Sequence, residues 1–428
     1  MLIEFKVKNF TSFKKEATFS MVSSEKLNEL LDNRIEMEND FHLLKAASIF
    51  GANASGKSNL LKALGFMVAF IERSMRDSQE GKRNFKNLTF SLDNESKDKA
   101  TDFEISFLME NQIVTYNFSL YKGDIASESL TVDDLEIFRR DASGIVTYSE
   151  KIFHTKDELN LKFSLTNSNS LFLTVLSVTN TKLAEDIIKY LTGNITFLSG
   201  YGNNAKFTKT VIKEDDSYKI KVLDLLKVAD FNITGLDVKQ HEFEIKPLGQ
   251  SDEEIPEEAR DKANRLLSKH NIYDSKGMIV DNKLFDVDSF ESSGTRVFLS
   301  LAGPIISVLE KGGVLIIDEA DALLHPLVTK YLIELFNTTE NNKSQLIITS
   351  HNSNILDQEL LRRDQIWFVE KDELEVSHLT SLSEYKFNGS VVRSDERYAK
   401  NYLRGKYGAI PYIKNDMIHN IFKSGLGD

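Results

Sequence analysis

The amino-acid sequence predicts an α/β protein with a mixed, mostly parallel sheet, an antiparallel β subdomain and a largely helical inserted lobe. Two observations predict the parallel sheet. A glycine-rich loop lies between an apolar strand and a helix near the N-terminus, and strands alternate with helices after residue 310. The two-residue periodicity of 103–150 is the third observation, and it predicts the antiparallel subdomain.

Composition limits the class of protein. The 428 residues carry a formal net charge of −12, which disfavours a generally basic nucleic-acid-binding protein. The chain contains no cysteine, so it has neither disulfides nor cysteine-ligated metal sites, as in a reducing compartment. No apolar run approaches the roughly 20 residues that a membrane helix needs. We therefore expect a cytoplasmic protein without membrane contact.

The N-terminal part, 1–150, is expected to form the first half of the main domain. Residues 2–8 and 16–21 show strand patterns. The apolar strand 46–50 leads directly into the loop GANASGKS, and a helical pattern follows at 58–75. The loop therefore lies between a strand and a helix, which is the context expected of a phosphate-binding loop.

The range 151–280 is predicted to be an inserted, mainly helical lobe. Helical periodicity covers 167–193 and 217–230. The segment 251–261 carries six acids and one arginine, which indicates an exposed loop or the start of a mobile helix.

The second half of the main domain is expected at 281–385. Its buried strands are predicted at 314–319, 345–351 and 365–371, with a helix after the first of them. The remaining residues, 386–428, contain eight Lys and Arg against four acids. We expect this segment to be a basic C-terminal tail that is either solvated surface or a docking site for an acidic partner.

The loop after the first buried strand matches the phosphate-loop pattern G-x-x-x-x-G-K-[ST] at every fixed position. Its glycines allow backbone N–H groups to approach phosphates, Lys57 supplies a positive charge, and the Ser58 hydroxyl is suited to Mg²⁺. The alternative is a Gly/Ser turn with an incidental lysine, which the strand and helix on either side disfavour. The residues expected to bind ATP here are Gly51, Asn53, Ala54, Ser55, Gly56, Lys57, Ser58 and Asn59.

Two carboxylates and a histidine end the next predicted strands. Asp318 and Glu319 follow four apolar residues, so they are expected at the carboxyl edge of the sheet, where ligands bind in open α/β folds. Asp318 is suited to hold Mg²⁺, and Glu319 to polarise the attacking water. His351 ends the following strand, where it is suited to sense the γ-phosphate. The alternatives are an acidic pair that caps the next helix and a structural histidine.

A short Ser-Ser-Gly-Thr turn, 292–295, precedes a predicted helix. Such a turn directs backbone N–H groups and the positive end of the helix dipole toward an anion. Taken alone, it is equally well read as a plain helix cap. Because the phosphate loop already surrounds its own phosphates, we expect the anion here to be the γ-phosphate of ATP bound to another copy of the chain.

Four motifs together resemble those of the ABC-class ATPase heads of the RecF, Rad50 and SMC type, namely GANASGKS, ESSGTR, LIIDEADALLHP and TSH. More narrowly, with FKVKNFTSF and YLRGKYGAIP, they resemble the bacterial anti-phage, abortive-infection ATPases of the RloA/AbiL kind, the AAA15 group. The resemblance covers both ends and the core, and covers 150–280 weakly.

The resemblance implies a homodimer in which two ATPs are sandwiched head to tail. Ser293 and Gly294 would contact the γ-phosphate on the opposite subunit, and the segment from Asp321 to His325 would form the D-loop at that interface. The implied cofactors are ATP and Mg²⁺, with Ser58 and Asp318 toward the metal. The residues with implied catalytic roles are Lys57, Glu319 and His351.

Several residues have no assigned role. No glutamine is convincing as the Q-loop residue of such ATPases, since Gln79 and Gln112 are both poor candidates. The basic cluster at 82–86 is interpreted as a solvated loop rather than a nucleic-acid contact. The histidines without metal-ligand spacing are His154, His241, His270 and His378.

The leading hypothesis is an ATP-hydrolysing switch that controls a partner effector in anti-phage defence, with the effector, a nuclease or toxin-like protein, encoded nearby. The rival hypothesis is a RecF/Rad50-like DNA-binding repair ATPase, against which the acidic net charge weighs. A third, weaker hypothesis is a toxin that acts by itself, although no second cluster of catalytic residues is visible in the sequence.

Overall fold

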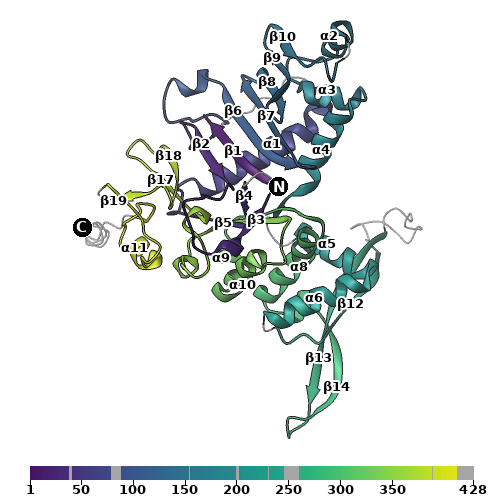
Figure 1. Cartoon of the computed structure of the whole chain (residues 1–428). Coiled ribbons are helices and arrows are strands. Elements are labelled where there is room, and N and C mark those ends of the chain that lie inside the picture. Colours follow the sequence, from purple (N-terminus) through teal and green to yellow (C-terminus); the bar gives the residue numbers. More distant parts are fainter. Residues whose placement is uncertain are drawn as a thin grey trace, which may run out of the picture.

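The structure of the protein is a computed structural model, and it describes residues 1–37, 41–78, 88–153, 155–198, 202–229, 231–244, 260–387 and 389–411. Two large sheets and the helices that pack on them form the body (Figure 1). A narrow β arm projects from the body and is formed by the second half of β13 (Arg260–Tyr273) and by β14 (Ile279–Asp286). None of the helices in these ranges is both long and apolar enough to cross a membrane.

The first sheet has seven antiparallel strands in the order β10-β9-β8-β7-β6-β1-β2. Buried and partly exposed residues alternate strictly along β6, so one face packs on the core. The predicted meander is confirmed, and it extends the two N-terminal strands into one sheet. Its strands are β1 (Leu2–Lys8), β2 (Ala17–Ser20), β6 (Thr101–Met109), β7 (Gln112–Tyr121), β8 (Asp124–Val132), β9 (Leu135–Asp141) and β10 (Gly144–Tyr148).

The second sheet has six strands in the order β11-β15-β16-β5-β17-β18, and all are parallel except β18. This is the predicted mixed sheet. Its strands are β5 (Ala46–Phe50), β11 (Ile195–Leu198), β15 (Gly313–Ile317), β16 (Ser344–Ser350), β17 (Ile366–Lys371) and β18 (Ser377–Ser381). The carboxyl ends of five adjacent parallel strands therefore meet at one edge of this sheet.

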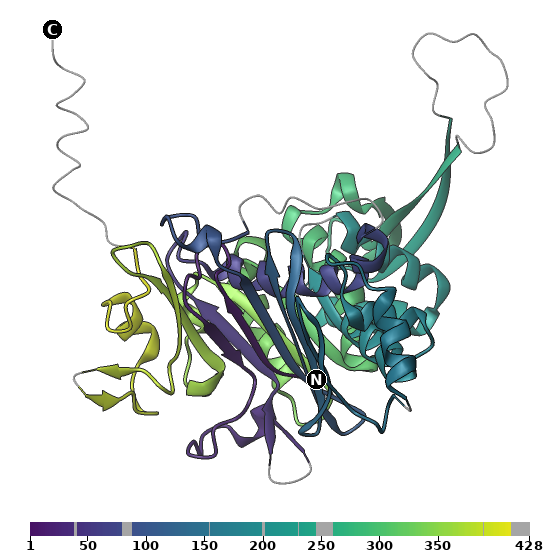
Figure 2. The same ribbon diagram turned by 90° about the horizontal axis from the view of Figure 1, so that it is seen from above.

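Helices cover both faces of the six-stranded sheet, and the side chains of its strands alternate between two apolar clusters. Ala47 and Ile49 of β5 join the cluster shared with the seven-stranded sheet, whereas Ala46 and Phe50 join the opposite one. Figure 2 shows the strands of the N-terminal half beside these helices. The helices on the first side are α1 (Lys57–Ser78), α3 (Phe172–Val178) and α4 (Lys182–Asn194); those on the second are α5 (Gly202–Glu214), α6 (Asp216–Val228), α8 (Ser293–Lys311) and α10 (Pro326–Asn337).

The range 151–280, predicted to be a mainly helical lobe, is divided in the structure. Its helices are present, but β11 pairs with β15 and so belongs to the six-stranded sheet. The end of the range begins a three-stranded antiparallel sheet, β12-β13-β14, that the sequence analysis largely missed. The strands β13 and β14 bury few residues, so they lack the apolar alternation that identifies a strand. The elements concerned are α2 (Lys156–Ser164), β12 (Gly235–Glu244), β13 (Arg260–Tyr273) and β14 (Ile279–Asp286). Residues 251–259 of the acidic segment lie outside the described ranges.

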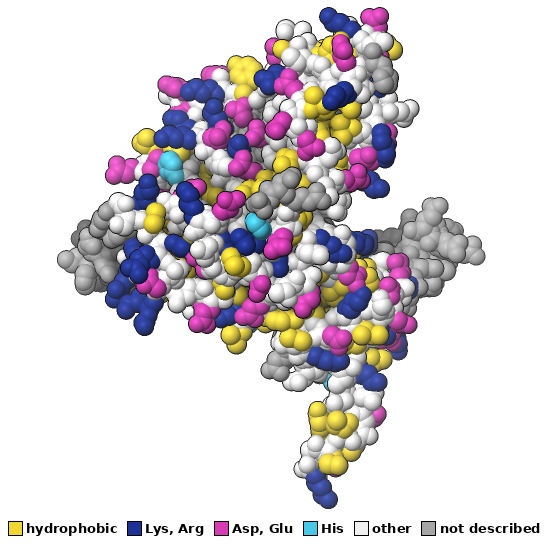
Figure 3. Space-filling view, viewed as in Figure 1, with side chains coloured by type: hydrophobic (Ala, Val, Ile, Leu, Met, Phe, Trp, Pro, Cys, Tyr) yellow, Lys and Arg dark blue, Asp and Glu magenta, His cyan; other side chains and the backbone are white. Residues whose placement is uncertain are grey.

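The segment predicted to be a basic tail packs on the body as far as residue 411. The rings of Tyr402 and Tyr407 stack on Phe368, 5.6 and 5.2 Å away between centroids, and Tyr402 also meets Phe50. Basic side chains gather on the surface over α11 (Figure 3). Residues 412–428 lie outside the described ranges.

The remaining elements are β3 (Arg34–Glu36), β4 (His42–Leu44), α7 (Val287–Phe290), α9 (Ala320–Leu323), β19 (Lys386–Phe387), β20 (Ser390–Val391) and α11 (Tyr398–Leu403).

Candidate functional site

An open pocket of about 540 Å³ lies at the carboxyl edge of the six-stranded sheet. The phosphate loop follows β5, the acidic pair follows β15, and the histidine follows β16, so three motifs far apart in the sequence meet there. The residues that line the pocket are Asn53, Ala54, Ser55, Gly56, Lys57, Ser58, Asn59, Glu319, Ala322, His351 and Lys371.

Lys57 begins α1 and directs its amine back into the phosphate loop. The Nζ atom donates hydrogen bonds to the carbonyl oxygens of Gly51 (2.9 Å) and Ala52 (3.0 Å). It also lies 3.4 Å from Nδ1 of His351. The amine and the imidazole therefore occupy one side of the pocket together, where both can reach the same phosphate group.

Burial lowers the pKa of the Lys57 amine below its ordinary value, and the nearby charges of Asp318, Asp321 and Glu319 oppose that shift. The ammonium has lost part of its hydration without a carboxylate in direct hydrogen-bonding contact. A phosphate that enters the pocket would offer it anionic oxygen partners, and charge-assisted hydrogen bonds are stronger than those to backbone carbonyls.

A small group of hydroxyl and carboxylate oxygens adjoins the loop. The Ser58 hydroxyl lies 3.2 Å from Oδ1 of Asp318, and Thr349 Oγ1 donates to the same oxygen at 2.5 Å. Thr349 also accepts a hydrogen bond from the backbone N–H of Glu319 (2.7 Å). Hard oxygen ligands of this kind fit Mg²⁺, which keeps several waters and needs few protein groups. Across the described ranges, no cluster of three or more His, Asp or Glu side chains offers a closed metal cage.

Glu319 adopts the left-handed backbone conformation, with φ of 52° and ψ of 49°. That conformation is uncommon for a residue other than glycine, and tertiary contacts must hold it. The adjacent carboxylates thus have separate environments: Asp318 bonds with Ser58 and Thr349, whereas Glu319 lines the open pocket. This arrangement suits one carboxylate for a metal and the other for a water molecule.

Asp321 holds the segment that carries the pocket histidine. Its carboxylate accepts the backbone N–H of His351 with both oxygens, at 3.2 and 3.1 Å. The first turn after β15 is therefore tied to the end of β16. His325, at the other end of this segment, caps α10 by accepting the N–H of Leu327.

The hairpin formed by β17 and β18 presses against the phosphate loop. Gly56 has φ of +120°, and a Cβ atom at this position would lie 2.4 Å from Oγ of Ser377. The Ser377 hydroxyl donates to the carbonyl oxygen of Ser55 (2.5 Å), and its N–H donates to the carbonyl of Ser12 (2.8 Å). The Asn59 side chain donates to the Ser12 hydroxyl (2.8 Å). Glycine is therefore required here by the close approach of another strand as well as by φ.

Lys371 is a pocket residue that the sequence analysis missed. It is the last residue of β17 and lines the pocket with the phosphate loop, while its Nζ lies 3.4 Å from Oε2 of Glu375. The only signal in the sequence is that it ends a predicted strand. Nothing in the sequence shows that this strand neighbours β5, a pairing made across more than 300 residues.

The structure places Ser293 and Gly294 outside this pocket. They begin α8, and the hydroxyl of the preceding Ser292 accepts the N–H of Thr295 (3.1 Å), which is the helix cap that the sequence allowed as the alternative interpretation. Ser293 is exposed to solvent. A serine at a free helix N-terminus, away from its own chain's pocket, is accessible to an anion brought by another molecule.

Glu291, the residue before this turn, is hydrogen-bonded to the β arm. Oε1 of Glu291 accepts hydrogen bonds from the Ser268 hydroxyl (2.5 Å) and pairs with Nε2 of His270 (2.7 Å), and both partners belong to β13. The His270 ring also meets the edge of Phe290, with 5.3 Å between centroids. The sequence analysis assigned no role to His270, because only the fold brings it to the turn.

Other residues considered in the sequence lie away from the pocket. Gln112 donates to Asp133 at the end of the meander, and none of the glutamines in the described ranges lines the pocket. His378 pairs with Asp372 (2.9 Å) in the β17–β18 hairpin. The residues outside the described ranges are Gln79, Lys82, Arg83, Lys86 and His154; of His241 only the backbone is described.

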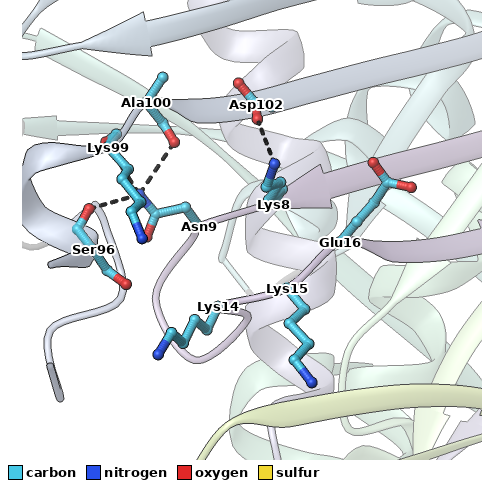
Figure 4. A pocket seen from close by; sticks show the side chains of 9 residues that line it. All are labelled: Lys8, Asn9, Lys14, Lys15, Glu16, Ser96, Lys99, Ala100 and Asp102. Atoms are coloured by element: carbon cyan, nitrogen blue, oxygen red, sulfur yellow. Dashed lines mark hydrogen bonds and ion pairs between the residues drawn. The ribbon is translucent and has the colours of Figure 1, made fainter.

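A second pocket, of about 390 Å³, is lined by lysines at the end of β1 and the start of the meander (Figure 4). Three of the four lysines have an acidic partner. The distances from Nζ to the carboxylate oxygen are 3.8 Å for Lys8 and Asp102, 2.8 Å for Lys14 and Asp93, and 3.1 Å for Lys99 and Glu95. These acids largely neutralise the basic charge, so the pocket gives no particular support to a nucleic-acid interface.

Comparisons with known proteins place the chain among nucleotide-binding domains. A family model described as "AAA domain, putative AbiEii toxin, Type IV TA system" matches residues 46–357, which include the phosphate loop, the α8 turn, the acidic pair and His351. This match confirms the predicted relation to abortive-infection ATPases. No curated protein matches the sequence.

Solved structures with similar folds include the SMC head domain from Thermotoga maritima, with 14% identity, a TM-score of 0.41, and coverage of 89% of this chain and 98% of that one. An SMC head domain with an extended coiled coil, bound to the C-terminal domain of ScpA derived from Pyrococcus furiosus, has 15% identity, a TM-score of 0.44, and coverage of 89% and 96%.

Proposed function

The chain belongs to the AAA family whose model covers residues 46–357, and we propose that this P-loop ATPase is an ATP-hydrolysing molecular switch. Two copies would associate head to tail around two ATPs and separate after hydrolysis. The proposal depends on one observation above all. The phosphate loop, Glu319 and His351 line one open pocket, and Asp318 contacts Ser58 of that loop. The Ser293 turn lies outside the pocket and is exposed.

In the proposed reaction, the backbone of the phosphate loop and Lys57 hold the β- and γ-phosphates. Glu319 orients a water molecule and accepts its proton as the water oxygen attacks the γ-phosphorus. The bond from that phosphorus to the bridging oxygen of ADP breaks, which yields ADP and phosphate. Mg²⁺, held from Ser58 and Asp318, would supply positive charge to the phosphate oxygens. His351 would donate a hydrogen bond to the γ-phosphate beside Lys57, with which it shares one side of the pocket.

The second half of each composite site would come from the other copy. Ser293 and the backbone N–H of Gly294 would approach the γ-phosphate from the side opposite Lys57, and the two-fold symmetry of a homodimer makes the two sites equivalent. Loss of the γ-phosphate would remove the anion that both copies bind, so hydrolysis would release the pair.

We propose that the switch restrains or activates a partner effector in defence against phage. The family description, which names a toxin of a type IV toxin–antitoxin system, supports a defence setting. The alternative of a DNA-clamping repair ATPase has less support, since the net charge is −12 and the lysine-lined pocket is largely neutralised by acids.

Replacement of the proposed base provides the test. Glu319→Gln should lower the turnover rate by roughly 100-fold or more, the usual contribution of a general base, and leave ATP affinity within about threefold. In light scattering, addition of ATP and Mg²⁺ should increase the mass of this variant above that of its nucleotide-free form. Glu334→Gln, on the surface of α10, is the matched control. A variant that binds ATP but shows no increase in mass at saturating ATP would contradict the sandwich.

A further inference from the structure

The arm formed by the second half of β13 and by β14 is a two-stranded ribbon that projects from the body (Figure 1). β12 pairs with β13 only as far as Lys269, so residues 270–283 have no third strand among the described ranges. A two-stranded ribbon in water is at best marginally stable by itself. The outer edge of β14 therefore offers a row of backbone groups to a further strand.

The end of the arm is apolar and exposed. Tyr273, Met278, Ile279 and Val280 are 58 to 65% exposed, and they lie together around the turn that joins the two strands. Apolar side chains are visible along the projecting arm in Figure 3. A cluster of this kind on an open strand is typical of a surface that pairs with another strand.

The sequence of β14 is complementary to itself when two copies run antiparallel about a two-fold axis at Asn282. Asp281 then lies opposite Lys283 of the second copy, and the axis repeats the pair, which gives two opposite-charge pairs. Val280 lies opposite Leu284, and the regular pairing ends there because the register of β13 and β14 shifts between Ile272 and Tyr273. Directly opposite residues project from the same face of a sheet, so apolar side chains meet apolar ones and each charge meets its opposite.

We propose that β14 is a self-association surface and that its partner is β14 of a second copy of this chain. The two arms form one four-stranded sheet, β13-β14-β14-β13, in which each outer edge of β14 is paired. Because the strands run in opposite directions, the two bodies lie at opposite ends of this sheet. The interface uses neither the phosphate-loop pocket nor Ser293, so it is independent of nucleotide and separate from the proposed ATP sandwich.

Charge reversal on the arm tests the register. The measurement is the dissociation constant of the nucleotide-free dimer, from light scattering over a concentration series. Asp281→Lys alone and Lys283→Asp alone each create two like-charge pairs and should weaken the dimer by about tenfold or more. The double variant restores two attractive pairs and should return to within about threefold of the unmodified chain. Circular dichroism of each variant verifies folding.

A single introduced cysteine locates the axis, because the chain has no cysteine of its own. Asn282→Cys should form a disulfide-linked dimer under mild oxidation, since directly opposed strand residues lie about 4.5–5.5 Å apart between Cα atoms, within disulfide reach. Asn271→Cys is the matched control: Asn271 pairs with Asn282 inside one arm. Across the proposed four-stranded sheet the two Asn271 positions are three strand spacings apart, roughly 14 Å, so this variant should not crosslink.

Three results would overturn the proposal: a chain that remains monomeric without nucleotide at every concentration, a double variant as weak as the single ones, or equal crosslinking at 271 and 282. Ser293→Arg, which is expected to break the ATP sandwich, should leave the nucleotide-free dimer intact. Failure of the ATP sandwich and failure of the arm pairing are therefore separate outcomes.

Discussion

The phosphate-loop side and the α8 side of the molecule differ in how their functional residues are held. On the first side, Lys57, Asp318 and His351 are tied to neighbours within the same chain by hydrogen bonds to backbone and side chains. On the second side, Ser293 is exposed, and the turn that carries it is tied through Glu291 to the arm. The first side is a nearly complete binding site, whereas the second requires another molecule under the proposed function.

This difference indicates where nucleotide affinity and turnover should be controlled. Changes on the phosphate-loop side should alter binding by a single subunit. Changes on the α8 side should leave binding unaltered and impair the step that needs two subunits.

Removal of the loop lysine should have the largest effect. Lys57→Ala eliminates the charge-assisted hydrogen bonds to the phosphates and should weaken ATP binding by about 100-fold or more, as measured by calorimetry. Lys62→Ala, on the exposed face of the same helix, is the control and should bind ATP as the unmodified chain does. Equal ATP affinity in both variants would show that the lysine of the phosphate loop does not bind the phosphates of ATP.

A bulky charge at the start of α8 should separate turnover from binding. Ser293→Arg should lower steady-state hydrolysis by roughly 100-fold, the effect of losing a hydrogen-bond donor to the reacting phosphate, with ATP affinity unchanged. Ser289→Arg, on the neighbouring exposed turn, is the control. If Ser293→Arg lowered binding and hydrolysis equally, Ser293 would belong to its own subunit's pocket.

Lys371 is expected to contribute weakly to ATP binding. Lys371→Ala should raise KM for ATP by about threefold, since a partly exposed charge contributes little, and kcat should stay constant. Glu375→Gln frees the lysine from its ion pair and should lower KM or leave it unaltered. A rise in KM in both variants would indicate damage to the hairpin rather than loss of a phosphate contact.

The smallest effect is expected where the arm meets the turn. His270→Ala removes one hydrogen bond to Glu291 and should lower kcat by about twofold to fivefold, with ATP affinity preserved, because the pocket lies elsewhere. His270→Gln keeps a donor and should recover most of the loss. A drop in ATP affinity in the alanine variant would contradict the separation of the two sides.

Much of the nucleotide pocket was predictable because its groups occur in short consecutive patterns. The phosphate loop, the acidic pair and His351 each end a strand whose apolar residues are visible in the sequence. Parallel strands bring their carboxyl ends to one edge, so the meeting of these motifs follows from fold class alone.

The rest of the pocket depended on which strands are neighbours. Lys371 and Ser377 reach the loop because β17 neighbours β5 and β18 neighbours β17. Thr349 reaches Asp318 because β16 neighbours β15, and residue spacing does not specify this strand order. The sheet of β12, β13 and β14 was missed for a different reason. Its strands β13 and β14 are largely exposed, and a strand without a buried face lacks the alternation on which prediction depends.

The sequence by itself determined the α/β class, the ATP-binding loop and the strand-end carboxylates, because backbone geometry and apolar periodicity are local properties of consecutive residues. Only the tertiary structure decided that Ser293 lies outside its own pocket, that His270 is bound beside it, and that no described strand pairs with the outer edge of β14. Those features depend on contacts between residues distant in the chain, which arise from packing and strand pairing rather than from local preference.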